Sequence, residues 1–327
     1  MKITFFEVEP WQKEYLKKKL KGHQLTFVSD ELTLKNLSKA KNSEAIVIFI
    51  YSVIDKEILD KLSNLKFIYT MSTGFNHIDI NACKQKGIKV FNVSSYGENT
   101  VAEHTIGLML SLSKKIPQSV MNTKKGNFDL DGLEGFDLKG KTLGVIGCGN
   151  IGQQVIKIAK AMEMNVIVMN RSQNEKLAKE LEFRYVSLKE LLSKSEIITL
   201  HVPLTPETKH MINMKNISLV KKGAYLVNTA RGGLIETKAL ISALDKGIIA
   251  GVALDVLEEE EDLKEDRHLS KRKLSAYENK IMKQNLKLLK DRDVLITPHS
   301  AFYTREAQQR ILDVTVENIF GKRKMIV

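Results

Sequence analysis

The residues best suited to chemistry in this sequence are a cation, a group of carboxylates and an imidazole, each just beyond a short apolar run. Arg231 follows AYLVN, four glutamates follow GVALDV, and His299 follows VLIT. Such runs are typical of buried strands, and ligands bind at the carboxyl edge of a parallel α/β sheet. A guanidinium there binds a carboxylate in bidentate fashion, and an imidazole donates a proton near neutral pH. The set indicates proton transfer to a small acid.

A carboxylate is a natural partner for His299. It would fix the tautomer of the ring and favour the protonated imidazole until a hydride has moved. The run of glutamates from Glu258 to Glu261 offers four candidates, and composition alone does not choose among them.

A glycine-rich turn, GCGNIG, supplies the second part of the chemistry. It follows the apolar run LGVI and opens an amphipathic helical pattern. Gly147 permits the tight turn, Gly149 lets the backbone approach a pyrophosphate, and Gly152 lets the helix pack on the strand. The N-terminus of that helix supplies N–H groups for the phosphates. This context favours a dinucleotide site over a purely structural turn.

The residues after the next apolar run indicate which dinucleotide binds. An NAD site usually has an Asp or Glu there for the ribose hydroxyls, but this chain has Asn170-Arg171-Ser172. Arg171 is suited to pairing with a 2′-phosphate, with Asn170 adding hydrogen bonds. The sequence therefore favours NADP. The alternative is that Arg171 stacks on the adenine or points to solvent and NAD binds.

Two series of strands and helices position these residues. Both alternate short apolar runs with helical patterns, which predicts parallel α/β units. A long helix is expected at about Asn99–Lys115, a further helix within the charged span Glu258–Asp293, and a last helix at Thr304–Phe320. The expected strands of the first series are Ile3–Phe6, Leu25–Val28, Ala45–Ile50, Leu65–Thr70 and Ile88–Val93. Those of the second are Leu143–Ile146, Val166–Met169, Ile197–Leu200, Ala224–Val227, Ile249–Leu254 and Val294–Ile296.

Composition limits the classes of function. A chain of 327 residues favours two domains. Its net charge of +12 comes from lysines spread along many predicted helices, so we expect a solvated surface and no nucleic-acid partner. No apolar stretch is long enough to span a membrane, and Cys83 and Cys148 are the only cysteines. We therefore expect a cytoplasmic protein without a disulfide framework, and no metal site.

These motifs together resemble the D-isomer-specific 2-hydroxyacid dehydrogenases across essentially the whole chain. The matching stretches are TGFNHID (73–79), NTVAEHTIGLML (99–110), LGVIGCGNIG (143–152), HVPLTPET (201–208), LVNTARGGLI (226–235), GVALDV (251–256) and TPHSAFYT (297–304).

The resemblance implies a role for each matched residue. The family's catalytic Arg, Glu and His fall on Arg231, Glu260 and His299, because the family's Glu lies five residues after the Asp of its LDV motif. The cofactor contacts that it implies, together with those expected from the residues, are Gly147, Gly149, Asn150, Ile151, Gly152, Asn170, Arg171, Val202, Pro203, Thr208, Thr229, Ala230, Arg231 and Asp255. The implied substrate contacts are Thr73, Gly74, Tyr96, Arg231 and Phe302.

Within the family, the charged span and ITPHSAFYT look most like the D-lactate dehydrogenase branch, in which residues matching Tyr96 and Phe302 line a small pocket. Asn170-Arg171 departs from that branch, which normally has an Asp there, and is similar to NADP-using glyoxylate/hydroxypyruvate reductases. A corepressor-like, cofactor-sensing binding protein is a further alternative, because such proteins keep the same three residues. The family is commonly dimeric, so we expect a homodimer with the Asn99–Lys115 region in the contact.

The expected fold is α/β, with two Rossmann-like domains built on doubly wound parallel sheets. A discontinuous substrate (catalytic) domain comprises residues 1–98 and 300–327. A dinucleotide-binding domain comprises residues 99–299. The expected reaction is the reversible reduction of a small 2-keto acid to a D-2-hydroxy acid with a nicotinamide cofactor.

Overall fold

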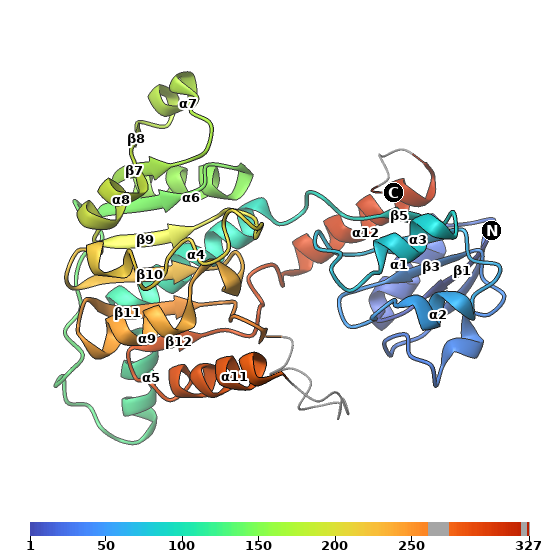
Figure 1. Cartoon of the computed structure of the whole chain (residues 1–327), viewed down its shortest axis with the longest axis horizontal. Coiled ribbons are helices and arrows are strands. Elements are labelled where there is room, and N and C mark those ends of the chain that lie inside the picture. The colour runs from blue at the N-terminus through green and yellow to red at the C-terminus, as the bar shows by residue number, and fades with distance from the viewer. Residues whose placement is uncertain (261–274, 322–325, 327) are drawn as a thin grey trace. The chain divides into compact units, whose positions relative to one another are not determined.

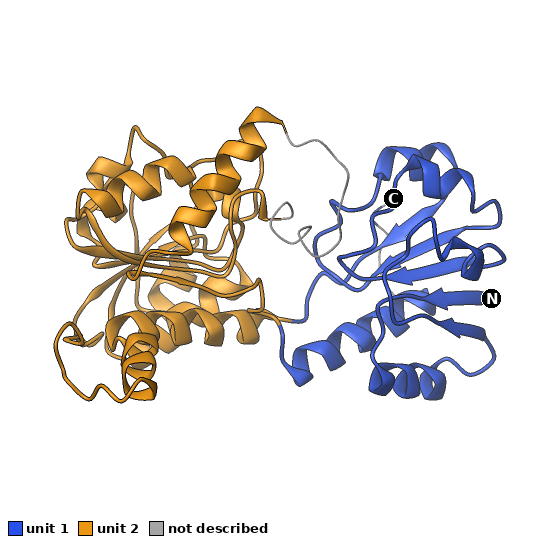
Figure 2. Ribbon diagram, turned by 90° about the horizontal axis from the view of Figure 1, so that it is seen from below, with its two compact units in different colours: residues 1–96, 303–327 blue, residues 97–302 orange. Residues whose placement is uncertain are grey.

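The structure is a computed structural model that describes residues 1–260, 275–321 and 326. It divides into two compact units, Met1–Tyr96 with Tyr303–Val327 and Gly97–Phe302 (Figure 2). Each unit holds one parallel sheet with helices, which confirms the expected fold class. The assignment of one unit to the substrate and the other to the dinucleotide stays a prediction.

The first unit is built on a five-stranded parallel sheet in the order β2-β1-β3-β4-β5. Its strands are β1 (Lys2–Phe5), β2 (Gln24–Phe27), β3 (Ala45–Ile48), β4 (Phe67–Thr70) and β5 (Lys89–Phe91). Its helices are α1 (Pro10–Lys19), α2 (Lys56–Asp60), α3 (Ile80–Gln85), α12 (Arg305–Ile319) and the short 3₁₀ turn η1 (Leu37–Lys39). Helix α12 contacts α1 and β4, so the end of the chain is part of this unit (Figure 1).

The second unit holds a seven-stranded parallel sheet in the order β12-β11-β10-β9-β6-β7-β8. Its strands are β6 (Thr142–Ile146), β7 (Asn165–Met169), β8 (Arg184–Tyr185), β9 (Ile197–Leu200), β10 (Ala224–Asn228), β11 (Ile249–Leu254) and β12 (Val294–Ile296). Its helices are α4 (Glu98–Ser113), α5 (Ile116–Lys124), α6 (Asn150–Ala161), α7 (Glu175–Glu180), α8 (Leu188–Lys194), α9 (Thr237–Asp245) and α11 (Ala276–Leu288), with 3₁₀ turns η2 (Ile217–Leu219) and η3 (Gly232–Leu234).

Two apolar cores lie on the two faces of this sheet. Helices α4 and α6 contribute to one core, and α8, α9 and the end of α11 contribute to the other (Figure 1). Because both faces are covered, the strands read as continuous apolar runs. The strand order reverses between the neighbours β6 and β9, and an open α/β sheet binds its ligand at such a point. The glycine turn lies at that point because it follows β6.

The structure also contains elements that the sequence did not predict. Helix α5 follows directly after the expected helix Asn99–Lys115, in a stretch for which no helix was predicted, and β8 has only two residues. Helix α11 fulfils the expectation of a helix within Glu258–Asp293, although Glu261 lies outside the described residues. Within residues 1–260, 275–321 and 326, no helix is long and apolar enough to cross a membrane, and no cluster of potential metal ligands occurs.

Candidate active site

The three glycines of the turn after β6 have three different surroundings. Gly147 has φ +98°, and a Cβ atom on it would lie 2.6 Å from the carbonyl oxygen of His201. A Cβ atom on Gly152 would lie 2.1 Å from the carbonyl oxygen of Gly147, so the first turn of α6 packs directly on the loop. A Cβ atom on Gly149 would meet nothing within 4 Å. The backbone at Gly149 is therefore open to a close approach.

The N-terminus of α6 is suited to an anion. Gly149 is its N-cap residue, and no side chain caps the helix there. The first N–H groups of a helix have no partner within the helix and carry the positive end of its dipole. A pyrophosphate at this position would satisfy these donors. The open backbone at Gly149 and the uncapped helix thus fit a dinucleotide.

Asn170 joins the glycine turn to the loop after β7. Its Oδ1 accepts a hydrogen bond from the N–H of Cys148 at 3.2 Å, and its Nδ2 donates to the carbonyl oxygen of Ser172 at 2.6 Å. A carboxylate has no N–H and would lose the second bond. Arg171 is exposed and close enough to Glu207 to contribute, after hydrogen bonds from Thr205 and the backbone, to lowering the pKa of Glu207.

The loop after β9 contains three further predicted cofactor contacts. Val202 packs against the glycine turn, because a Cβ atom on Gly147 would lie 2.6 Å from its Cγ1. The hydroxyl of Thr208 donates to the carbonyl oxygen of Pro203 at 2.7 Å and accepts from the N–H of Thr205 at 2.8 Å. These bonds give the Pro203–Thr208 loop a fixed shape. In this structure the hydroxyl of Thr208 therefore forms hydrogen bonds within its own loop.

Arg231 lies in a tight turn after β10. Asn228, which is 1% exposed, donates from Nδ2 to the carbonyl oxygen of Arg231 at 2.9 Å and accepts the N–H of Ala230 at 3.0 Å. The guanidinium donates to the carbonyl oxygen of Ala230 at 2.7 Å. On the same turn, the hydroxyl of Thr229 lies 2.8 Å from that of Thr105 on α4. Buried hydrogen bonds thus fix the backbone that carries the cation.

His299 and Glu260 are in direct contact. Nδ1 of His299 lies 2.5 Å from Oε1 of Glu260, and Oε2 of Glu260 accepts the N–H of Leu257 at 3.3 Å. A carboxylate only accepts hydrogen bonds, so Nδ1 carries a proton and Nε2 is the ring nitrogen left to face a substrate. The backbone of His299 has φ +54°, a conformation that non-glycine residues adopt mainly where the surroundings impose it.

Asp255 holds the loop that carries His299. Its side chain is buried, and Oδ1 accepts from the hydroxyl of Thr297 at 2.5 Å and the N–H of Ser300 at 2.8 Å. Oδ2 accepts from the N–H of Ala301 at 2.9 Å. The resemblance implies that Asp255 contacts the cofactor, whereas these bonds engage both carboxylate oxygens in fixing residues 297–301. In the sequence, only the presence of an Asp in the LDV motif pointed to a role for Asp255, and nothing in the sequence indicated that it holds the His299 loop.

The predicted substrate residues fall in different units. Thr73, Gly74 and Tyr96 belong to the first unit, and Arg231 and Phe302 belong to the second. The loop after β4 is held by its own bonds. The hydroxyl of Thr73 donates to the carbonyl oxygen of Val93 at 2.8 Å, and that of Ser72 donates to the carbonyl oxygen of Gly74 at 2.7 Å.

Asn150 and Ile151, two of the predicted cofactor contacts, are the first residues of α6. This is the position expected of residues beside a pyrophosphate.

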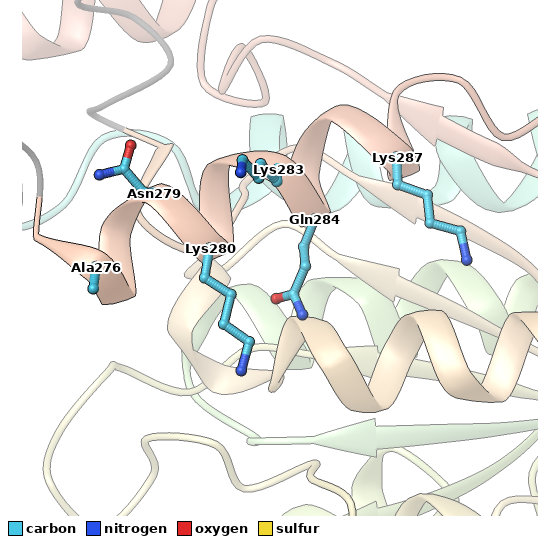
Figure 3. Close-up of a pocket in the computed structure, with 6 residues that line it drawn as sticks. All are labelled: Ala276, Asn279, Lys280, Lys283, Gln284 and Lys287. Atoms are coloured by element: carbon cyan, nitrogen blue, oxygen red, sulfur yellow. The ribbon is translucent and has the colours of Figure 1, made fainter.

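A surface groove of about 360 Å³ lies along α11 and is far too open to enclose a small acid. Its lining residues, Ala276, Asn279, Lys280, Lys283, Gln284 and Lys287, all come from that one helix (Figure 3). None of them is a predicted site residue. The groove is therefore not part of the candidate active site.

Comparison with known proteins agrees with this geometry. A family model described as D-isomer specific 2-hydroxyacid dehydrogenase, NAD binding domain, matches residues 106–301. The chain belongs to this family. It is therefore an NAD-binding oxidoreductase that acts on the CH–OH group of a 2-hydroxy acid, which confirms the resemblance seen in the sequence.

Full-length relatives support the same assignment. D-lactate dehydrogenase from Escherichia coli is 35% identical over 331 residues, which cover 99% of this chain and 97% of that protein. Aromatic 2-oxoacid reductase from Clostridium sporogenes strain ATCC 15579 is 37% identical over 326 residues. The alignment covers 98% of this chain and 95% of that protein. The crystal structure of D-lactate dehydrogenase from Aquifex aeolicus, complexed with NAD and lactic acid, superimposes with a TM-score of 0.83 at 37% identity, covering 98% and 96% of the two chains.

Proposed function

We propose that this dehydrogenase reversibly reduces a small 2-keto acid to the D-2-hydroxy acid, in the manner of a D-lactate dehydrogenase. The observation that carries the proposal is the 2.5 Å contact between Glu260 and His299. These residues lie in the segments that follow β11 and β12, in the sheet that also bears the glycine turn. A bound nicotinamide cofactor supplies the hydride that reaches C2 of the keto acid.

Three side chains perform the remaining chemistry. Nε2 of His299 donates a proton to the carbonyl oxygen as negative charge develops there. Glu260 keeps the ring in the orientation that aims Nε2 and stabilises the imidazolium before the proton leaves. Arg231 binds the substrate carboxylate and draws electron density from the carbonyl. The backbone at Thr73 and Gly74 assists in holding that carboxylate.

For the cofactor, we propose that NAD binds and that NADPH is preferred. Gly147, Gly149 and Gly152, with Asn150 and Ile151 at the start of α6, would hold the pyrophosphate. Val202, Pro203 and Thr208 would line the adenine side, and Thr229, Ala230 and Asp255 the nicotinamide side. The end of β7 has no carboxylate to repel a 2′-phosphate, and the exposed Arg171 is suited to pair with it.

The side chain of the keto acid is set by Tyr96 and Phe302 in this proposal. The matched relatives include a D-lactate dehydrogenase and an aromatic 2-oxoacid reductase, whose named substrates differ in size. We place this chain with the small-substrate branch. The alternative is an NADPH-dependent glyoxylate/hydroxypyruvate reductase, which Asn170-Arg171 favours.

We further propose a cytoplasmic homodimer. The free thiols of Cys83 and Cys148 are buried, as in proteins of reducing compartments. Next to the predicted contact region at Asn99–Lys115, helix α5 and the following loop expose large apolar side chains, and such patches mark interaction sites. They are Ile116, Val120, Met121, Phe128 and Leu130. A monomeric mass by light scattering at working concentration would contradict the dimer.

The function is tested by following oxidation of NADPH and NADH with pyruvate, glyoxylate, hydroxypyruvate and phenylpyruvate. We expect turnover with pyruvate and a higher kcat/KM with NADPH. Preference for glyoxylate or hydroxypyruvate would establish the reductase instead. A purified protein that binds cofactor but turns over none of these acids would favour the cofactor-sensing binding protein.

A further inference from the structure

A buried carboxylate lies two residues before Glu260. The side chain of Glu258 is 2% exposed and receives four hydrogen bonds. Oε1 accepts from Nε2 of His210 and from the hydroxyl of Tyr277, each at 2.6 Å. Oε2 accepts from the N–H and the hydroxyl of Thr237, at 3.1 and 2.6 Å. Burial raises the pKa of Glu258, but the bonds from Thr237, Tyr277 and His210 together outweigh it and hold the pKa below its ordinary value.

These donors come from three separate elements of the second unit. His210 lies in the loop after β9, Thr237 begins α9, and Tyr277 lies in the first turn of α11. The main-chain oxygen of Glu258 also accepts a hydrogen bond from Nδ2 of the buried Asn285 on α11, at 2.8 Å. One residue therefore ties the segment after β11 to two helices and a loop.

The same segment is in contact with the Arg231 turn. A Cβ atom on Gly232 would lie 2.0 Å from the carbonyl carbon of Leu257 and 2.3 Å from the nitrogen of Glu258, so the two backbones touch. The N–H of His210 donates to the carbonyl oxygen of Gly233 at 2.8 Å. The partners of Glu258 thus hold the Arg231 turn from a second side.

Glu260 depends on this segment as well, because its Oε2 accepts the N–H of Leu257. A cavity of about 10 Å³ lies beside the contact and is lined by Asn228, Gly232, Thr237 and Glu258, among others. Such a volume is at the lower limit for one water molecule. The backbone around Glu258 therefore has little room to move while its four donors are in place.

We propose that Glu258 is a positioning residue that sets Arg231 and Glu260 relative to each other. It acts through the Leu257–Glu258 peptide and does not itself touch the substrate. The inference rests on the proposed function, in which Arg231 binds the substrate carboxylate and Glu260 orients the proton donor His299. Glu258 would anchor both Arg231 and Glu260. Displacement of catalytic groups by about 1 Å costs on the order of 10²-fold in rate.

The test compares Glu258→Gln with Glu259→Gln, which removes the same charge from the adjacent, exposed residue. In E258Q an amide NH₂ replaces one acceptor among four donors. We expect kcat to fall on the order of 10²-fold and KM for the keto acid to rise several-fold, with NADH affinity unchanged. E259Q should resemble the wild type. Near-native kcat and KM in a folded E258Q would overturn the proposal.

Tyr277→Phe provides a milder variant in case E258Q does not fold. It deletes one hydroxyl from a residue that is 44% exposed, and we expect the same changes in kcat and KM at smaller size. Unchanged kinetics in Y277F together with a misfolded E258Q would mean that Glu258 is structural only, and would overturn the proposal.

A second readout does not depend on turnover. The ring ¹H–¹⁵N signals of His299 can be followed by NMR, with their assignment given by their absence in His299→Asn. A displaced Glu260 alters the hydrogen bond at Nδ1, so these signals should shift in E258Q and stay in place in E259Q. If the wild type turns over no keto acid, the proposed function fails, while this shift still decides the role of Glu258.

Discussion

Oε1 of Glu260 lies 2.5 Å from Nδ1 of His299, and Asp255 accepts hydrogen bonds from the hydroxyl of Thr297 and the N–H of Ser300 on the two sides of that histidine. The imidazole is thus held by a carboxylate at one ring nitrogen and by a loop that cannot rotate freely. His299 itself adopts φ +54°, which the bonds from Thr297 and Ser300 to Asp255 maintain. This arrangement leaves Nε2 with a fixed direction.

The first prediction concerns His299→Asn. Asn tolerates a positive φ better than Ala, so this variant removes the imidazole with less backbone strain. We expect turnover to fall by about 10²–10⁴-fold, as on removal of a general acid, with NADH binding unchanged. Steady-state kinetics and NADH fluorescence titration measure the two quantities. Near-native turnover would contradict the mechanism.

Glu260→Gln tests the partner of the imidazole. The amide oxygen of the variant can still accept the hydrogen bond from Nδ1 of His299, but it carries no charge to stabilise the imidazolium. We therefore expect kcat for reduction to fall by up to about 10²-fold, with NADH affinity unchanged. Glu259→Gln is the matched control. Near-native kcat in E260Q would show that another group assists His299.

The two glycines Gly149 and Gly152 should respond differently to a methyl group. Gly152→Ala places Cβ against the carbonyl oxygen of Gly147, so we expect a loss of about 1–3 kcal/mol in unfolding free energy. A Cβ atom at Gly149 meets nothing within 4 Å, and the backbone there is extended, with φ −75° and ψ −169°, so the stability of Gly149→Ala should match that of the wild type. Its affinity for NADH should nevertheless fall about tenfold or more, because the methyl group stands where a pyrophosphate approaches. Thermal unfolding and fluorescence titration separate the effects.

Much of the fold could be predicted because its central strands are buried on both faces. Continuous apolar runs such as those of β6 and β10 need no knowledge of their neighbours to be recognised. The two-residue strand β8 has no such run. Helix α5 starts after Lys115, which has a left-handed φ of +51°, and its residues have no buried face, so the sequence shows no amphipathic pattern there.

The candidate site could be predicted only in part, for a physical reason. The turn glycines and His299 follow strand ends, so their place on the sheet edge is readable from the chain. The partners of Asp255 and Glu258 are mostly N–H and hydroxyl groups far away in sequence, which no local pattern encodes. Among adjacent glutamates, folding decides which one is buried as an anchor and which one reaches His299.

Arg171→Ala tests the cofactor preference. If its guanidinium pairs with a 2′-phosphate, the variant loses one charge-assisted hydrogen bond to NADPH, and KM for NADPH should rise about tenfold or more. KM for NADH should stay the same, because NADH has no 2′-phosphate. Arg184→Ala removes another exposed arginine, one that pairs with Glu190, and serves as the control. An equal effect on both cofactors would indicate that Arg171 stacks on the adenine or contacts a shared phosphate.

The last prediction concerns the first unit, where Glu7 accepts hydrogen bonds from the N–H groups of Phe49, Tyr51 and Ser52. Burial raises the pKa of Glu7 despite these bonds. A carboxyl with a raised folded pKa contributes stability that is present below its unfolded pKa and lost as pH rises through the folded value. The unfolding free energy of the wild type minus that of Glu7→Gln should therefore decrease with rising pH above about 4.5, the ordinary value for Glu. For Glu44→Gln the same difference should instead rise with pH, and it should do so below about 4.5, because bonds from Lys2 and Lys66 lower the pKa of Glu44. Denaturant titrations at several pH values measure both differences. A difference for Glu7→Gln that stays constant or rises with pH above about 4.5 would contradict the prediction.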